Sequence, residues 1–131
     1  MDGQDLRAVA IEIYDLISRG DLTRLKELLP EDESLPIVIG TAPGEWFEGR
    51  SDVLVALAAQ VRDYPNLRIE AGDLRSGEDG EMGWIADRPA LVMPDGSRLA
   101  TRQTSTFKRE AGTWRLVCSH LSIGVADDDD G

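Results

Sequence analysis

The chain has 131 residues, of which 41% are hydrophobic and 30% charged, and its formal net charge at pH 7 is −11. This length and composition predict one globular domain built around a single core. The acidic balance argues against nucleic acid and anionic membranes as partners, because both attract surfaces rich in lysine and arginine. A single cysteine excludes an internal disulfide, so we expect a cytoplasmic protein.

We expect no signal peptide, membrane-spanning helix, cofactor or bound metal. The first residues are acidic where a signal peptide is basic, and no apolar run approaches the roughly 20 residues that span a membrane. With one histidine and one cysteine, a metal site would have to be built mostly from scattered carboxylates. The glycine-rich motifs that hold nucleotide phosphates are absent from the sequence.

Two helices are predicted at the start of the chain. Apolar residues recur at helical spacing from Leu6 to Ile17, and Gly20 ends this first helix. Asp21 can cap a second, short helix, which carries its own stripe of leucines and ends at Pro30.

A strand, a loop and a third helix are predicted next. Residues 35–40 form a short apolar run that is typical of a strand, and residues 41–50 contain the proline and glycines of a loop. Ser51 is then expected to cap a third helix, which closes before Pro65.

The second half of the chain predicts an antiparallel sheet. From residue 67 onward the apolar positions alternate with polar ones, which is the period of a strand. Four strands are expected, over residues 67–75, 81–93, 98–110 and 114–125. Helices followed by a meander of strands predict an α+β fold, with the helices covering one face of a curved sheet.

The domain is expected to comprise residues 1–126. Residues 127–131 read DDDDG, and four consecutive aspartates repel one another and bury nothing. We therefore expect an acidic, disordered tail after the folded domain.

The last two hairpins predict which side chains share a face of the sheet. If residues 95–96 and 111–112 are two-residue turns, Trp84, Phe107 and Leu116 lie together on one face. Strand alternation continues this face toward a polar end, which comprises Arg88, Gln103, Ser105, Cys118, His120 and Ser122. A face that is apolar at one end and polar at the other predicts a pocket at the polar end.

The opposite face is predicted to be a contact surface. Its members are Thr104, Thr106, Val117, Leu121 and Ile123. This set is too apolar to face only solvent, so we expect it to bury against a second copy of the chain.

Five stretches of the sequence together resemble a SnoaL-like domain. These are RGDL, GEWFEG, GWIADRP, RQTSTF and WRLVCSHLS, and the likeness runs from about Leu6 to Val125. The family belongs to the nuclear transport factor 2-like, or ketosteroid-isomerase-like, superfamily. The resemblance implies a cone-shaped α+β barrel in which three helices pack in a strongly curved sheet, with an internal pocket and frequent homodimers through the outer sheet face.

The resemblance does not extend to the isomerase chemistry. Ketosteroid isomerase uses an aspartate base together with a tyrosine and a protonated aspartate that donate to an oxyanion. The base position falls near Gly40 or Thr41, where no carboxylate stands. The protonated aspartate would fall on Ser105, and the tyrosine on Ile13, one residue before Tyr14. Steroid isomerisation is therefore disfavoured.

His120 is the one candidate for proton transfer, since histidine most often fills that role at neutral pH. The alternative is a structural histidine that fixes the strand end through a hydrogen bond to Gln103. Cys118 is expected on the same face, about 6.6 Å away along the strand, which is too far for a cysteine–histidine dyad. We interpret Cys118 as a small buried apolar residue.

Two aromatic residues and one arginine complete the predicted pocket. Trp46 lies in a loop flanked by glycines and is expected to close the pocket mouth or fill the core, and Trp84 is expected near the same cavity. Arg88 would face Gln103 and suit an anionic or carbonyl-bearing ligand. Its alternative role is a structural ion pair with an acidic residue of a helix.

Three classes of function remain open from the sequence. The leading one is the binding or sensing of a small organic molecule, without turnover, in a pocket lined by Trp46, Trp84, Arg88, Gln103, Ser105, Cys118, His120 and Ser122. The second is an enzyme of the cyclase, isomerase or dehydratase type in which His120 moves a proton. The third is a structural dimerisation or regulatory module.

Overall fold

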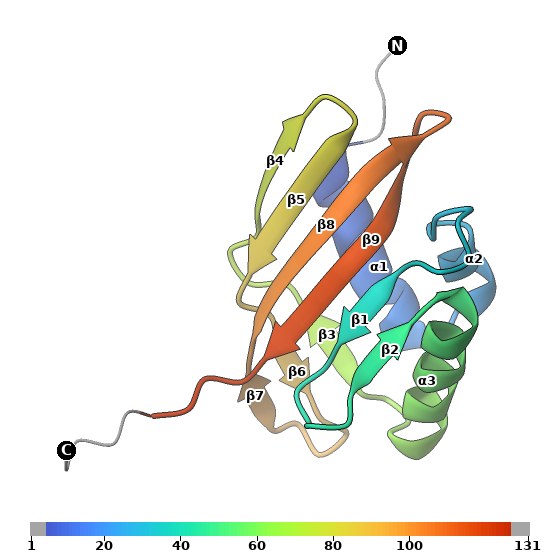
Figure 1. Ribbon diagram of the computed structural model, residues 1–131. Coiled ribbons are helices and arrows are strands. Elements are labelled where there is room, and N and C mark those ends of the chain that lie inside the picture. The colour runs from blue at the N-terminus through green and yellow to red at the C-terminus, as the bar shows by residue number, and fades with distance from the viewer. Residues whose placement is uncertain (1–4, 127–131) are drawn as a thin grey trace.

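The computed structural model describes residues 5–126, and in it three helices cover the inner face of a curved sheet (Figure 1). The helices are α1 (Leu6–Arg19), α2 (Leu22–Lys26) and α3 (Arg50–Asp63). The strands are β1 (Ile37–Ile39), β2 (Trp46–Glu48), β3 (Arg68–Glu70), β4 (Arg75–Asp79), β5 (Met82–Asp87), β6 (Ala90–Val92), β7 (Arg98–Ala100), β8 (Arg102–Glu110) and β9 (Thr113–Ser122). The predicted α+β architecture, with its three helices and curved sheet, is confirmed.

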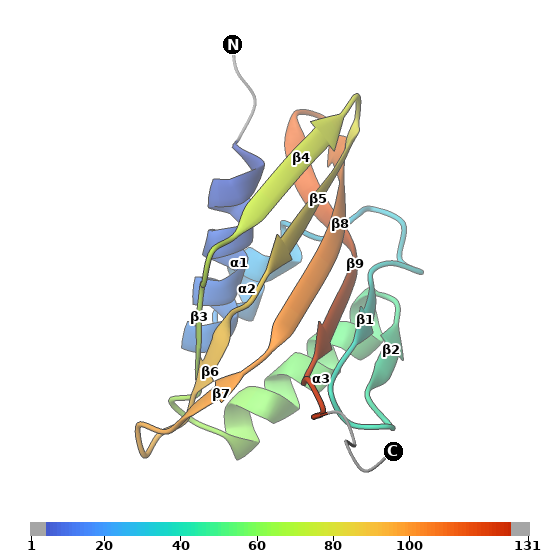
Figure 2. The same ribbon diagram turned by 90° about the vertical axis from the view of Figure 1, so that its left-hand side faces the viewer.

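The strands form two sheets. The larger sheet has six strands in the order β2-β1-β9-β8-β5-β4, and the smaller has three in the order β3-β6-β7. All pairs are antiparallel except β1 and β9, which are parallel. Figure 2 shows the large sheet nearly edge-on, with α1 and α2 on one side of it.

The first two helices form because their sequences supply both caps and an apolar face. Asp5 accepts a hydrogen bond from the backbone of Arg7 at the start of α1, and Gly20 ends the helix at a φ of 72°, which a glycine adopts without strain. Asp21 then caps α2, as the sequence predicts. The apolar face of α1 packs into a core whose largest fully buried side chains are Trp114 and Phe107.

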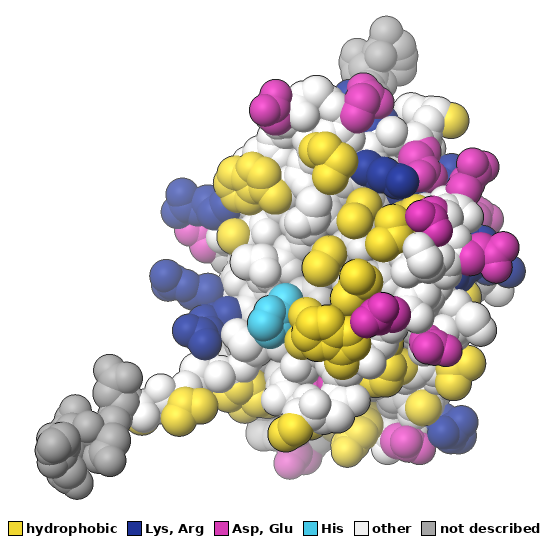
Figure 3. All heavy atoms as spheres, viewed as in Figure 1, with side chains coloured by type: hydrophobic (Ala, Val, Ile, Leu, Met, Phe, Trp, Pro, Cys, Tyr) yellow, Lys and Arg dark blue, Asp and Glu magenta, His cyan; other side chains and the backbone are white. Residues whose placement is uncertain are grey.

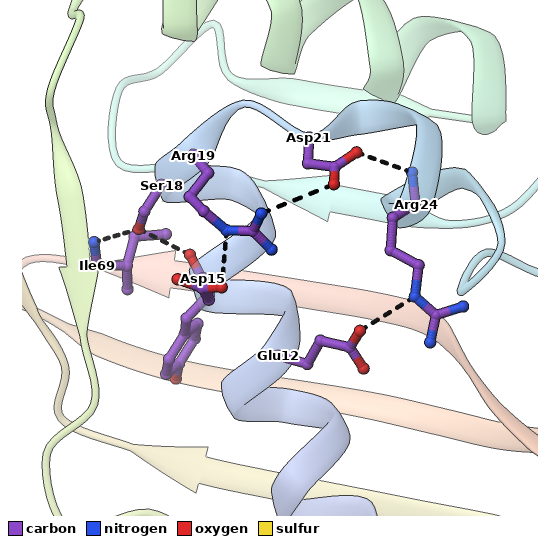
Figure 4. Close-up of polar contacts among 8 residues, drawn as sticks. Glu12, Asp15, Ser18, Arg19, Asp21, Arg24 and Ile69 are labelled. Atoms are coloured by element: carbon purple, nitrogen blue, oxygen red, sulfur yellow. Dashed lines mark hydrogen bonds and ion pairs between the residues drawn. The ribbon is translucent and has the colours of Figure 1, made fainter.

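Polar contacts fix the corner between α1, α2 and β3 (Figure 4). The Ser18 hydroxyl accepts a hydrogen bond of 2.8 Å from the Ile69 backbone, which ties α1 to β3. Arg24 of α2 donates to Glu12 of α1 at 3.0 Å. The first contact holds the end of α1 against the small sheet and the second joins α2 to α1, so together they fix one wall of the molecule's interior.

Two predictions for residues 41–51 are wrong. Residues 46–48 are strand β2 rather than loop, because a tight turn returns them along β1 with Trp46 opposite Ile39. The Glu45 carboxylate stabilises this turn by accepting a 3.0 Å hydrogen bond from the Ala42 backbone. The cap of α3 is Gly49 rather than Ser51, and its φ of 98° explains why glycine stands there.

The predicted long strands over 81–93 and 98–110 are each broken into two. Pro89 has no N–H to donate, so the β5 ladder ends there. Across from it, Thr101 directs its backbone N–H and its hydroxyl to the Pro89 carbonyl, at 3.1 and 2.7 Å. The chain turns at this corner, and in the smaller sheet β6 pairs with β3 while β7 pairs with β6.

Among residues 5–126, no helix has the length and apolar character needed to cross a membrane. The cytoplasmic location stays a prediction. The predicted acidic tail, residues 127–131, lies outside the described residues.

Candidate functional site

A cavity of about 80 Å³ lies between the helices and the inner face of the large sheet. Most of its wall is apolar and comes from all three helices and from β1, β3, β5, β8 and β9. Its polar members are Tyr14, Gln103, Ser105 and Ser119. The cavity is therefore apolar with a set of hydrogen-bonding side chains along part of its wall.

The polar wall is a connected network across β8 and β9. The Gln103 amide donates to the Ser105 hydroxyl at 3.1 Å and also to the Ser119 hydroxyl. Ser105 and Ser119 stand opposite each other in the ladder and their hydroxyls are 3.2 Å apart. Each hydroxyl can rotate to donate or accept, so this wall can pair with either kind of polar ligand group.

A buried tyrosine and aspartate join α1 to the end of β5. The Tyr14 hydroxyl donates to Asp87 Oδ2 at 3.0 Å. Asp87 also accepts hydrogen bonds from the backbone of Gly72, at 3.1 Å, and of Arg88, at 2.8 Å. Burial, and then the Asp87 carboxylate, raise the pKa of Tyr14 far above its usual 10.0. Tyr14 is therefore a hydrogen-bond donor, and Asp87 is a carboxylate already engaged by three donors.

The sequence analysis did not predict this pair, although the inward position of Asp87 could have been inferred from it. Asp87 is two residues beyond the buried Ile85, so strand alternation alone places it on the inner face. Its partner Tyr14 is 73 residues away, and no local pattern links the two.

The predicted orientation of His120 is wrong, and so is that of Cys118 and Ser122. Phe107 pairs with Leu116, as predicted, but Thr106 pairs with Cys118, so Val117 is an extra residue in β9. Such a β-bulge exchanges the two faces of the strand beyond it. Ser119 therefore takes the inner face, and His120 stands exposed on the outer face opposite Thr104.

Trp84 also faces outward, contrary to prediction. The turn between β6 and β7 has three residues, 94–96, since the backbone N–H of Met93 donates to Ser97 and Gly96 has a φ of 91°. A three-residue turn in place of two shifts the register by one, so Trp84 pairs with Thr106 and not with Phe107.

The remaining predicted residues are divided between two places. Trp46 lies on the outer face, 58% exposed, with its indole N–H donating to Glu48 at 2.8 Å. Gln103 and Ser105 face the cavity as predicted. A groove of about 520 Å³ on the outer side brings together four of the predicted set: Arg88, Gln103, His120 and Ser122. The roles assigned to all these residues stay predictions.

Leu121, predicted on the contact surface, is opposite Gln103 and belongs to the inner face. Thr104 and Thr106 lie on the outer face as predicted. Within residues 5–126, no three His, Cys, Asp or Glu side chains meet in a group that could hold a metal ion.

Comparison with known proteins places this fold. Residues 6–126 match the family described as the SnoaL-like domain. No curated protein matches the chain by sequence. Among solved structures, an NTF2-like protein of unknown function from Pseudomonas putida superposes with a TM-score of 0.82 at 13% identity, covering 96% of this chain and 89% of that one.

Two further structures carry suggested activities in their names. A proposed dehydratase of the NTF2-like family from Streptomyces avermitilis has a TM-score of 0.73 and 18% identity over 92% of this chain and 95% of its own. A proposed ketosteroid isomerase from Shewanella frigidimarina has a TM-score of 0.72 and 13% identity over 88% and 92%. At these identities the likeness shows the shared fold alone.

Proposed function

The chain belongs to the SnoaL-like domain family, and we propose that it binds a small, mainly apolar molecule in its inner cavity without converting it. The observation that carries the proposal is the placement of Gln103, Ser105 and Ser119 in one wall of an otherwise apolar cavity. Apolar walls with a few placed polar groups are typical of small-molecule sites.

The size of the cavity limits the ligand. A volume of about 80 Å³ has room for roughly five to eight water-sized atoms. Pockets for drug-sized ligands measure about 300–1,000 Å³. The ligand we propose therefore has a handful of non-hydrogen atoms, one of which is a hydroxyl or carbonyl oxygen.

The wall chemistry favours binding over turnover. The described residues that line the cavity include no histidine, lysine, aspartate or glutamate. Tyr14 holds its proton, and the nearby Asp87 is engaged by three donors, so neither is a free base. An enzyme that relies on His120 loses its support, because that side chain is on the other side of the sheet.

Phenol and toluene test the proposal, because they share a ring and differ by a hydroxyl in place of a methyl group. We expect phenol to bind the full-length protein more tightly than toluene in NMR titrations. The double variant Ser105→Ala/Ser119→Ala should weaken phenol by about two- to tenfold, since each lost hydrogen bond contributes about 0.5–1.5 kcal/mol. Toluene binding should not fall.

Ser51→Ala is the matched control, because that hydroxyl is exposed on α3. The proposal is wrong if neither probe shifts cavity resonances at millimolar concentration. It is also wrong if phenol and toluene bind equally and the serine variants leave phenol unchanged.

A dimerisation surface is the second candidate, favoured by the outer sheet face. Trp46, Trp84 and Met82 lie on this face and are 58%, 50% and 44% exposed. Figure 3 shows hydrophobic side chains spread across it. We propose that a second copy of the chain covers these residues about a two-fold axis, because large exposed aromatics mark interaction surfaces.

A further inference from the structure

The outer groove gathers positive charge at the end of the sheet where β9 finishes. Its basic side chains are Arg75 from β4, Arg88 after β5 and Arg102 from β8, with His120 of β9 beside them. Figure 3 shows dark-blue cationic side chains projecting along this edge next to the cyan histidine, which is the only one in the sequence. The groove measures about 520 Å³, within the size range of small-molecule sites.

Two of the three guanidinium groups are available to a ligand. Arg75 donates to Asp73 at 2.8 Å, and this hydrogen bond, with a smaller contribution from the charge of Arg88, lowers the pKa of Asp73. Over residues 5–126, the guanidinium groups of Arg88 and Arg102 form no hydrogen bond or ion pair. The other carboxylate of the groove, Asp87, is buried and already accepts from three donors.

This lack of partners stands out in so acidic a chain. The sequence has 25 acidic residues against 14 lysines and arginines, and arginines elsewhere, such as Arg19, Arg24 and Arg98, pair with a carboxylate. Hydroxyl groups complete the groove, since Thr104 lies opposite His120 and Ser122 lies opposite Arg102 in the ladder. Guanidinium and hydroxyl groups therefore line one groove, and both can donate hydrogen bonds to carboxylate and phosphate oxygens.

We propose that this groove binds a small organic anion that carries two or more carboxylate or phosphate groups. Two guanidinium groups that are unpaired within residues 5–126, one just after β5 and one on β8, suit two anionic groups, whereas a monoanion would engage one of them in an exposed, salt-screened contact. The groove opens on the outer face and shares one lining residue, Gln103, with the inner cavity, but its arginines and His120 do not line that cavity, so the proposal does not rest on the function proposed for the cavity.

Calorimetric titration of the full-length protein with pyrophosphate and with citrate tests the proposal. At an ionic strength of about 0.01 M, where screening is weak, we expect at least one probe to bind, and the pair separates a phosphate from a carboxylate preference. The variant Arg88→Gln/Arg102→Gln should lose about tenfold to a hundredfold in affinity, because each removed group takes a charge-assisted hydrogen bond with it.

Arg62→Gln/Arg68→Gln is the matched control. It removes the same two charges from exposed positions outside the groove and should keep the wild-type affinity. The ring signals of His120, the only histidine, should shift on addition of the bound probe in the wild type and the control. Absence of binding by both probes, or an equal loss in both double variants, would overturn the proposal.

The chain's own acidic end provides the last test. Asparagine in place of Asp127 to Asp130 in the full-length protein removes four negative charges. If the probes bind only after this change, the acidic end and not a small anion is the groove's occupant, and the proposal is wrong. Binding to both proteins supports it.

Discussion

Replacing Tyr14 with phenylalanine removes one hydroxyl from the interior and leaves the ring in place. The lost interaction is the 3.0 Å hydrogen bond to Asp87. Hydrogen bonds to charged groups contribute about 1.5–3 kcal/mol to stability. Asp87 keeps its backbone donors at Gly72 and Arg88, so the carboxylate is not stranded, and we expect a loss of about 2 kcal/mol.

Urea denaturation of the variants Tyr14→Phe and Tyr64→Phe measures this loss, and the second variant is the control. Tyr64 is the other tyrosine and is 59% exposed, so Tyr64→Phe should change the free energy of unfolding by less than about 0.5 kcal/mol. The two substitutions are chemically identical, and only the surroundings of the hydroxyl differ.

The effect of Tyr14→Phe should also depend on pH in a defined direction. The pKa of Tyr14 is raised in the folded protein, so above pH 10 the unfolded chain loses a proton that the folded one keeps. Its contribution to stability is therefore complete below pH 10 and decreases as the pH rises, by up to about 1.4 kcal/mol per pH unit. The stability difference between wild type and Tyr14→Phe should narrow accordingly above pH 10.

Two results would refute this reasoning. One is a loss for Tyr14→Phe no larger than that for Tyr64→Phe, which would mean that the buried hydrogen bond adds nothing to stability. The other is a gap between wild type and Tyr14→Phe that widens with pH, because the linkage argument fixes the opposite sign.

Three further substitutions test the packing and the two faces of the sheet. Gly83→Ala should lower the free energy of unfolding by about 1–3 kcal/mol in thermal or urea denaturation, because its new Cβ would meet a side chain of α1 at 2.6 Å. Gly44→Ala is the control and should be nearly neutral, because no atom lies within 4 Å of its new Cβ. Trp84→Asp should convert a dimer to monomers in sedimentation velocity. An obligate dimer persists at roughly tens of micromolar, so a wild-type protein that is already monomeric at that concentration would contradict the dimer proposal. His120→Ala should leave stability within about 0.5 kcal/mol and phenol affinity unchanged in NMR titration, and a weaker phenol complex would contradict the outward placement of the imidazole.

The sequence was sufficient wherever a local signal decided the structure. Gly20 and Asp21 mark the end of one helix and the start of the next, and both act as predicted. The turn at residues 111–112 set the register of β8 and β9 correctly near the turn, which placed Phe107 and Leu116 together in the core. The α+β layout follows from the change of period after residue 66.

The sequence was insufficient wherever a single residue decided which way a strand faces. In the hairpin around Gly96, the letters PDGS are compatible with both a two-residue turn and a three-residue turn. The length of this turn determines the face of the sheet on which Trp84 lies. At Leu116, Val117 and Cys118 three apolar residues follow one another, so the letters allow both a continuous strand and the bulge that turns His120 outward. The candidate site was therefore predicted on the right strands with part of it on the wrong face.

The extra residue at Val117 gives β9 two possible inner linings, of which the fold uses one. With the bulge present, Ser119 is the side chain that β9 adds to the cavity's polar wall. If the same residues paired without the bulge, Val117 would stand opposite Thr106, and Cys118 and His120 would turn inward without any change in the residues themselves. Deletion of Val117 would instead leave Cys118 opposite Thr106, so Ser119 would stay on the inner face and Cys118 and His120 on the outer one. A change of pairing at this one position, and not a change of side chains or of strand length, would therefore exchange the hydroxyl lining for a thiol and an imidazole.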